Sequence, residues 1–145
     1  MKSPESYPGR TVVENIVLLP AATRSTTGTG SAIVLDGFEA FVLQCELTAA
    51  ATDVGDTLDV FVQTTVDGTT WLDAVHFTQM LGNGGAKRYV SKISAALAQA
   101  EYETGTSLSA AAVRHIFGSQ WRVRWTITDA NANGSFTFSV TANAT

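Results

Sequence analysis

The sequence predicts an all-β fold: an antiparallel β-sandwich or barrel-like domain with an extended N-terminal arm and a short helical insertion. Apolar and polar residues alternate along residues 58–66 and again along residues 121–128. A period of two is the spacing of a strand whose two faces meet different surroundings. Turn-forming residues follow both segments, at Asp67-Gly68 and across residues 129–134. Short strands separated by such turns are typical of antiparallel all-β domains.

Residues 1–30 are expected to form an arm outside a β-domain that spans residues 31–145. Prolines and a Ser/Thr/Gly-rich run disfavour helix in this lead-in, and residues 12–19 have the composition of one apolar strand. No nearby segment offers this strand a hairpin partner. It is therefore expected to pair with a neighbouring subunit, with a disordered tail followed by a first strand as the alternative. The interface candidates in this arm are Val12, Val13, Ile16, Val17 and Leu18.

The next part of the chain is expected to be rich in strands. Residues 58–66 and 71–77 give the clearest hairpin, because the D-G-T-T turn between them contains glycine. Residues 87–94 alternate more weakly and are expected to form a further strand. Two pieces of strand precede the hairpin, at residues 32–35 and 38–47.

Residues 94–117 are harder to assign. Their first part is rich in alanine, and the segment SAAAVRHI has Ser109 as a possible N-cap and Gly118 as a stop, which favours one or two helical turns. The alternative is a long loop between strands. Loops of that length are uncommon in compact domains and are usually functional.

The segments at residues 121–128 and 136–140 are expected to pair as the last hairpin. Trp121 and Trp125 share one face of the first strand, and both are expected to be buried against phenylalanines of the second. The opposite face of the first strand carries two arginines.

The composition argues against several classes of protein. Charged residues make up 15% of the 145 residues and the net charge is −4, with no basic run. Phosphate binding depends on clustered Lys and Arg, so no nucleic-acid partner is expected. No run of 18 apolar residues occurs, and no membrane partner is expected. Low surface charge suits a protein that buries much of its outside against partners.

The residue types that carry catalysis or bind metals are sparse. His76 and His115 are the only histidines, and no zinc or G-x-S-x-G motif occurs, so neither an enzyme nor a cofactor is expected. The single Cys45 is expected to be a buried hydrophobe, and a chain without disulfides fits folding in a reducing cytosol. The acidic segment at residues 53–59 suggests a calcium loop, but a solvated turn that enters a strand accounts for it better.

Three further residues are interface candidates. Trp71 opens a strand, where it is either core or an aromatic contact anchor. Arg122 and Arg124 lie on the strand face opposite Trp121 and Trp125. They either pair with acidic residues across strands on a solvated face or form salt bridges in an oligomer.

The motifs V-D-G-T-T-W at residues 66–71, R-V-R-W-T-I at 122–127 and F-T-F-S-V at 136–140 carry a resemblance to a known family. Over residues 58–140 the chain resembles small auxiliary proteins of tailed bacteriophages, above all head decoration proteins. The resemblance implies a structural virion protein, made in the host cytoplasm, that binds the major capsid protein on the outer capsid surface and stabilises the shell. It also implies a homo-oligomer, most often a trimer. The alternatives are a phage tail or neck protein, and a carbohydrate-binding or adhesion module that stacks sugars on Trp71.

Overall fold

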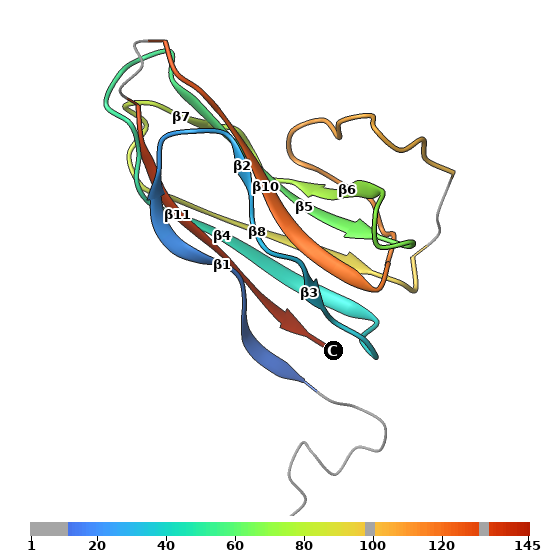
Figure 1. Ribbon diagram of the computed structural model, residues 1–145. Coiled ribbons are helices and arrows are strands. Elements are labelled where there is room, and N and C mark those ends of the chain that lie inside the picture. Colours follow the sequence, from blue (N-terminus) through green and yellow to red (C-terminus); the bar gives the residue numbers. More distant parts are fainter. Residues whose placement is uncertain (1–11, 98–100, 131–133) are drawn as a thin grey trace, which may run out of the picture.

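The computed structural model describes residues 12–97, 101–130 and 134–145, which form two antiparallel sheets packed face to face (Figure 1). Every strand pairing in this part of the chain is antiparallel. The expectation of an all-β fold is therefore confirmed, and the arrangement is that of a sandwich.

The four-stranded sheet has the order β1-β11-β4-β8. Its outermost strands are the first long strand of the chain and a strand from the middle of the chain. The bounds are Val13–Arg24 for β1, Phe136–Ala144 for β11, Ala40–Ala49 for β4 and Lys87–Ser94 for β8.

The seven-stranded sheet has the order β2-β10-β5-β6-β9, with β3 paired to β10 and β7 paired to β5. Its long central strands are β10 (Gln120–Thr128), β5 (Thr57–Thr65) and β6 (Trp71–His76). The predicted hairpin between β5 and β6 is confirmed. The short strands are β2 (Gly28–Thr29), β3 (Ile33–Val34), β7 (Met80–Leu81) and β9 (Ala112–Val113).

The core lies between the two sheets, where alternate side chains of each strand meet. Along β4, Phe41, Leu43, Cys45 and Leu47 all point inward and are buried. Trp121 of β10 enters the same core from the other sheet, and its ring packs edge-on against that of Phe41 at a centroid distance of 4.8 Å. This alternation is the reason that a period-two sequence forms a two-layer fold: only one face of each strand needs apolar side chains.

The expectation that the apolar strand near the N-terminus lies outside the β-domain is corrected. β1 pairs with β11 from Val13↔Ala144 to Arg24↔Phe136, and Leu18 and Leu19 are buried in the shared core. The partner of this strand is thus the C-terminal strand, which no local sequence signal indicates. Residues 1–11 of the expected arm lie outside the described residues.

The predicted last hairpin is also corrected, because β10 and β11 belong to different sheets. β10 pairs with β5, whereas β11 pairs with β1 and β4. Trp125 does meet Phe138, with ring centroids 5.9 Å apart, but across the sandwich rather than along a ladder. A polar connection between two strands can either form a hairpin or cross from one sheet to the other, and its sequence does not distinguish the two.

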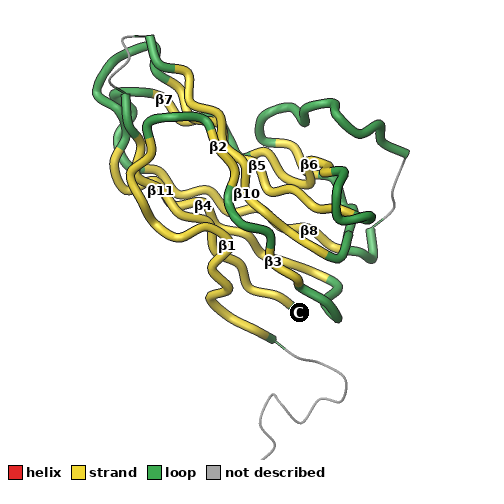
Figure 2. The backbone as a smooth tube through the Cα atoms, in the orientation of Figure 1, coloured by secondary structure: helices red, strands yellow, loops and turns green. Residues whose placement is uncertain are grey.

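The expected helical insertion does not form in the described residues, which contain no helix (Figure 2). Residues 101–117 contain turns, loop and the short strand β9. At the predicted N-cap, the backbone N–H of Ala112 donates to the carbonyl oxygen of Ser109 and forms a turn. Within this turn Ala111 has a left-handed φ of 62°, so the backbone does not continue as a right-handed helix. Residues 98–100 lie outside the described residues. In the described part of the chain no helix is long and apolar enough to cross a membrane.

Candidate functional site

The outer face of the seven-stranded sheet is polar but largely buried. Residues 101–113, which we call the covering segment, arch over this face beside β6 (Figure 1). Beneath them lie two rows of cross-strand neighbours. The first row is Arg122–Gln63–Asp73 and the second is Arg124–Phe61–His76, each running across β10, β5 and β6.

A β-bulge explains why Asp73 and His76 share this face. They are three residues apart, so a regular strand would send their side chains to opposite faces. The register between β5 and β6 shifts between Val62 and Gln63, and Ala74 and Val75 both lie in the core. The extra residue in β6 returns His76 to the side of Asp73.

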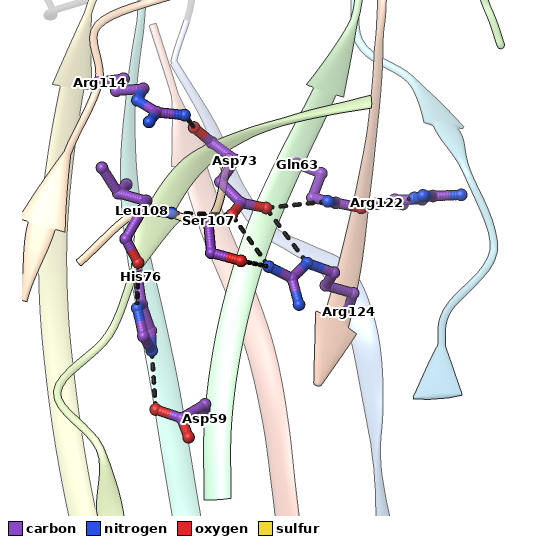
Figure 3. Close-up of polar contacts among 9 residues, drawn as sticks. All are labelled: Asp59, Gln63, Asp73, His76, Ser107, Leu108, Arg114, Arg122 and Arg124. Carbon is purple, nitrogen blue, oxygen red and sulfur yellow. Dashed lines mark hydrogen bonds and ion pairs between the residues drawn. The ribbon is translucent and has the colours of Figure 1, made fainter. Parts of the chain in front are cut away.

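Asp73 is the centre of the polar network (Figure 3). Its side chain is 4% exposed and accepts bonds from Nε and Nη2 of Arg124, at 3.2 and 2.9 Å. Nε2 of Gln63 and the backbone N–H of Leu108 donate to the same carboxylate, at 2.9 and 3.1 Å. Burial alone raises the pKa of Asp73, but these hydrogen bonds and the charge of Arg124 outweigh it and hold the pKa below its ordinary value.

Arg124 is fixed in three directions. Its fork binds Asp73, its Nη2 also donates to Oγ of Ser107 at 3.3 Å, and its guanidinium lies 3.6 Å from the ring centroid of Phe61. A planar guanidinium is suited to simultaneous bidentate pairing and stacking. Arg124 therefore joins β10, β6 and the covering segment.

Arg122 pairs differently from its neighbour. Its Nε donates to Oε1 of Gln63 at 2.8 Å, and its guanidinium stacks 4.1 Å from the ring centroid of Trp71. Partial burial, and then the charge of Arg124, lower the pKa of Arg122. Within the described residues, its two terminal nitrogens have neither a hydrogen-bond acceptor nor a carboxylate partner.

His76 binds an acceptor at each ring nitrogen. Nδ1 lies 2.7 Å from the carbonyl oxygen of Leu108, and Nε2 lies 2.8 Å from Oδ1 of Asp59. The imidazole ring therefore links Asp59 of β5 to the backbone of the covering segment. Burial raises the pKa of Asp59, but hydrogen bonds from His76 and Gln79 and the nearby positive charges outweigh it, so that this pKa is lowered.

Between the sheet and the covering segment lies a pocket of about 250 Å³. Its floor is formed by Gln63, Asp73 and Arg124, and Trp71 and residues 105–107 form its walls. Trp71 is half-buried and lies on the outer face, so it is not part of the sandwich core. The structure thus brings together three of the residues expected at an interface: Trp71, Arg122 and Arg124.

The remaining interface candidates lie on β1 and at its start. Val12, Val13 and Val17 are exposed, Ile16 is half-buried, and Leu18 is a core residue. Leu18 is therefore excluded as a contact residue. The exposed valines are carried by the other sheet and not by the sheet that holds the pocket.

The outer face of the four-stranded sheet forms a second candidate surface. One row across all four strands consists of Val17, Thr141, Gln44 and Val90. Val42 lies in the next row. Val17, Val42 and Val90 are 50%, 43% and 60% exposed, and we call the surface formed by these five residues the valine face. A shallow depression of about 200 Å³ lies within it.

The groups that could carry covalent or metal chemistry have structural partners instead. Cys45 is buried as expected, and burial raises the pKa of its thiol to about 12. Nδ1 of His115 accepts a bond from the backbone N–H of Ser94. Among the described residues, no group of three or more His, Cys, Asp or Glu side chains could hold a metal ion.

Sequence reasoning did not identify Gln63, Asp73 or His76 as members of this site. Gln63 had a usable signal, because strand alternation places it on the face of Asp59 and Phe61. The other two depend on the bulge in β6 and on the covering segment, which no pattern in the sequence indicates.

Comparison with known proteins does not assign the chain to a family: no family model, curated protein or solved structure matches it. The class that the fold defines is an antiparallel all-β protein with two sheets. The resemblance of its strand motifs to phage decoration proteins stays a prediction.

Proposed function

We propose that this protein is a structural component of a phage virion, a head decoration protein that binds the outer surface of the capsid. The valine face is the observation that carries the proposal. It combines three exposed valines with uncharged Thr141 and Gln44 on the outer face of one sheet. Depletion of charge distinguishes the centre of a protein interface from ordinary surface.

The distribution of charge on this sheet supports a docking role. The charged side chains of the outer face lie toward one edge, where Arg88 of β8 pairs with Glu46 of β4 at 2.9 Å. Lys92 follows on the same strand, opposite Val42. An apolar centre beside a charged rim is the usual anatomy of a non-obligate interface.

The partner in this proposal is the major capsid protein, and the protein decorates the shell as a homo-oligomer, with a trimer expected. β1 is an end strand of the four-stranded sheet, and the exposed Val12 and Val13 lie at its start. We assign contacts between copies to this edge, because an unpaired strand edge must be paired or covered. Binding involves no catalysis, nucleic acid or membrane, and the protein resides on the virion surface.

The proposal is tested by mixing the purified protein with empty expanded capsids and measuring cosedimentation. Val42→Glu and Val90→Glu each place a charge on the valine face, and we expect at least tenfold weaker binding. Val54→Glu is the matched control, because Val54 is 81% exposed in the turn between β4 and β5. Its binding should equal that of the wild type.

Two results would contradict the proposal. One is absence of binding by the wild-type protein; the other is equal loss of binding in the valine-face variants and the control. Cosedimentation with isolated tails instead of capsids would favour the tail or neck alternative.

A further inference from the structure

The pocket on the seven-stranded sheet presents more hydrogen-bond donors than acceptors. Both carboxylate oxygens of Asp73 are already occupied by four donors, and Oε1 of Gln63 accepts from Arg122. The side chains of Thr106 and Ser107 contribute hydroxyl groups to the wall. Arg122 stacks on the Trp71 wall and contributes two terminal nitrogens that lack a partner among the described residues. An acceptor-rich ligand is the chemical complement of such a site.

The local charge selects an anionic ligand. Arg124 lines the pocket, Arg122 lies beside it against the lining residues Trp71 and Gln63, and Asp73 is the only acidic residue in the lining. Arg114, which is also buried, donates to the backbone oxygen of Asp73 at 3.4 Å and adds positive charge behind the site. Asp73 forms its ion pair with Arg124, so it does not neutralise Arg122, whose positive charge is available to a ligand. A planar guanidinium with free terminal nitrogens binds a carboxylate well.

We infer that this pocket binds a carboxylated sugar, such as a uronic acid unit at or near the end of an acidic polysaccharide. The indole of Trp71 offers an apolar wall for a pyranose ring. Thr106, Ser107 and Gln63 bind hydroxyl groups, and Arg122 binds the carboxylate. The volume of about 250 Å³ suits one or two sugar units rather than a folded partner.

A peptide is a poorer occupant. Extended peptides gain affinity by adding to a free strand edge. This pocket lies on the face of β5, β6 and β10, between the sheet and the covering segment, and β5 has a paired strand on each side. The central strand of the pocket floor therefore has no free backbone edge to which a peptide could add.

The inference is independent of the capsid proposal, although the two are compatible. The valine face and the pocket lie on the outer faces of opposite sheets. A molecule that docks through the valine face directs the pocket away from its partner. The pocket can then bind polysaccharide in the surroundings of the assembled particle, and sugar binding can be measured on the free protein without capsids.

The test is calorimetric titration of the full-length protein with trigalacturonic acid at low salt. Methyl-esterified trigalacturonate is the matched neutral ligand, because it differs only in its carboxyl groups. We expect measurable binding of the acid and at least tenfold weaker binding of the ester. Arg122→Gln and Trp71→Ala should each weaken binding of the acid at least tenfold. Arg88→Gln, on the other sheet, should leave it unchanged.

A second measurement locates the ligand. In amide NMR spectra, the acid should shift the signals of Thr106, Ser107 and the Trp71 indole, and the spectra also establish that each variant is folded. The inference is overturned if the acid does not bind at millimolar concentration, if the ester binds equally, or if the shifts lie elsewhere. Tighter binding by a glutamate-rich peptide than by the trisaccharide would also overturn it.

Discussion

Asp73→Asn is the substitution that most directly tests whether the polar network holds the covering segment. The change keeps the shape of the side chain but removes the charge that Arg124 and the Leu108 N–H both bind. Asparagine also presents an NH₂ group to one of these donors. The side chain of Asp73 is 4% exposed, so solvent replaces the lost acceptor only in part.

The expected cost follows from the burial of the two partners. Removing one member of a fully buried ion pair costs about 3–5 kcal/mol. The side chain of Arg124 is 24% exposed, so it can recover part of its hydration. We therefore expect Asp73→Asn to lower the free energy of unfolding by about 2–4 kcal/mol.

Urea unfolding of the wild type, Asp73→Asn, Arg124→Gln and the double variant forms a double-mutant cycle. Contacting residues of one network should be coupled, here by about 1–3 kcal/mol. Arg88→Gln is the control, since its pair with Glu46 is exposed and should contribute under about 1 kcal/mol. A cost below about 0.5 kcal/mol for Asp73→Asn, or additive single variants, would refute the reasoning.

Three further outcomes are expected. Trp121→Ala should destabilise the protein by about 3–5 kcal/mol in urea unfolding, because Trp121 is 1% exposed in the core; a cost below about 1 kcal/mol contradicts this. Asp59 and Asp73 have lowered pKa values, so the stability they contribute is present above their unfolded pKa of about 3.9 and is lost as the pH falls through the folded values. Unfolding curves between pH 2 and 6 should show this loss, and a stability that rises on acidification would oppose it. His76→Phe keeps the ring stack on Phe61 but removes both polar contacts, so amide hydrogen exchange in the covering segment should accelerate; unchanged exchange would show that His76 does not anchor the segment.

The strands themselves could be predicted because their signal is local. Residues 58–66 were expected and β5 is Thr57–Thr65, and the expected strand at 87–94 coincides with β8. Alternation of apolar and polar residues reports which face of a strand is buried, and the core of β4 follows it.

Strand partners could not be predicted in the same way, because pairing between distant segments leaves no local pattern. Val13 pairs with Ala144, almost the whole chain away, and β1 therefore resembled an arm. The polar connection after β10 resembled a hairpin turn, although it joins two sheets.

Only some residues of the candidate site could be predicted from the sequence. Arg122 and Arg124 were expected on the face opposite the core, and they do lie there with Trp71. Their acidic partner was not identified. Asp73 of β6 reaches Arg124 of β10 across β5, which lies between the two strands, and this strand order could not be predicted from the sequence. The helical composition of the covering segment was misleading, because the Leu108 backbone is bonded to Asp73 and His76, and the Ser107 hydroxyl to Arg124, in place of helical hydrogen bonds.

The most direct test of the central claim is an electron cryo-microscopy reconstruction of expanded capsids saturated with the protein. The account predicts density on the outer shell surface in which Val17, Val42 and Val90 contact the major capsid protein, while the pocket beside Trp71 faces solvent. A decorated shell in which the seven-stranded sheet faces the capsid, or a shell without added density at saturating protein, would contradict it.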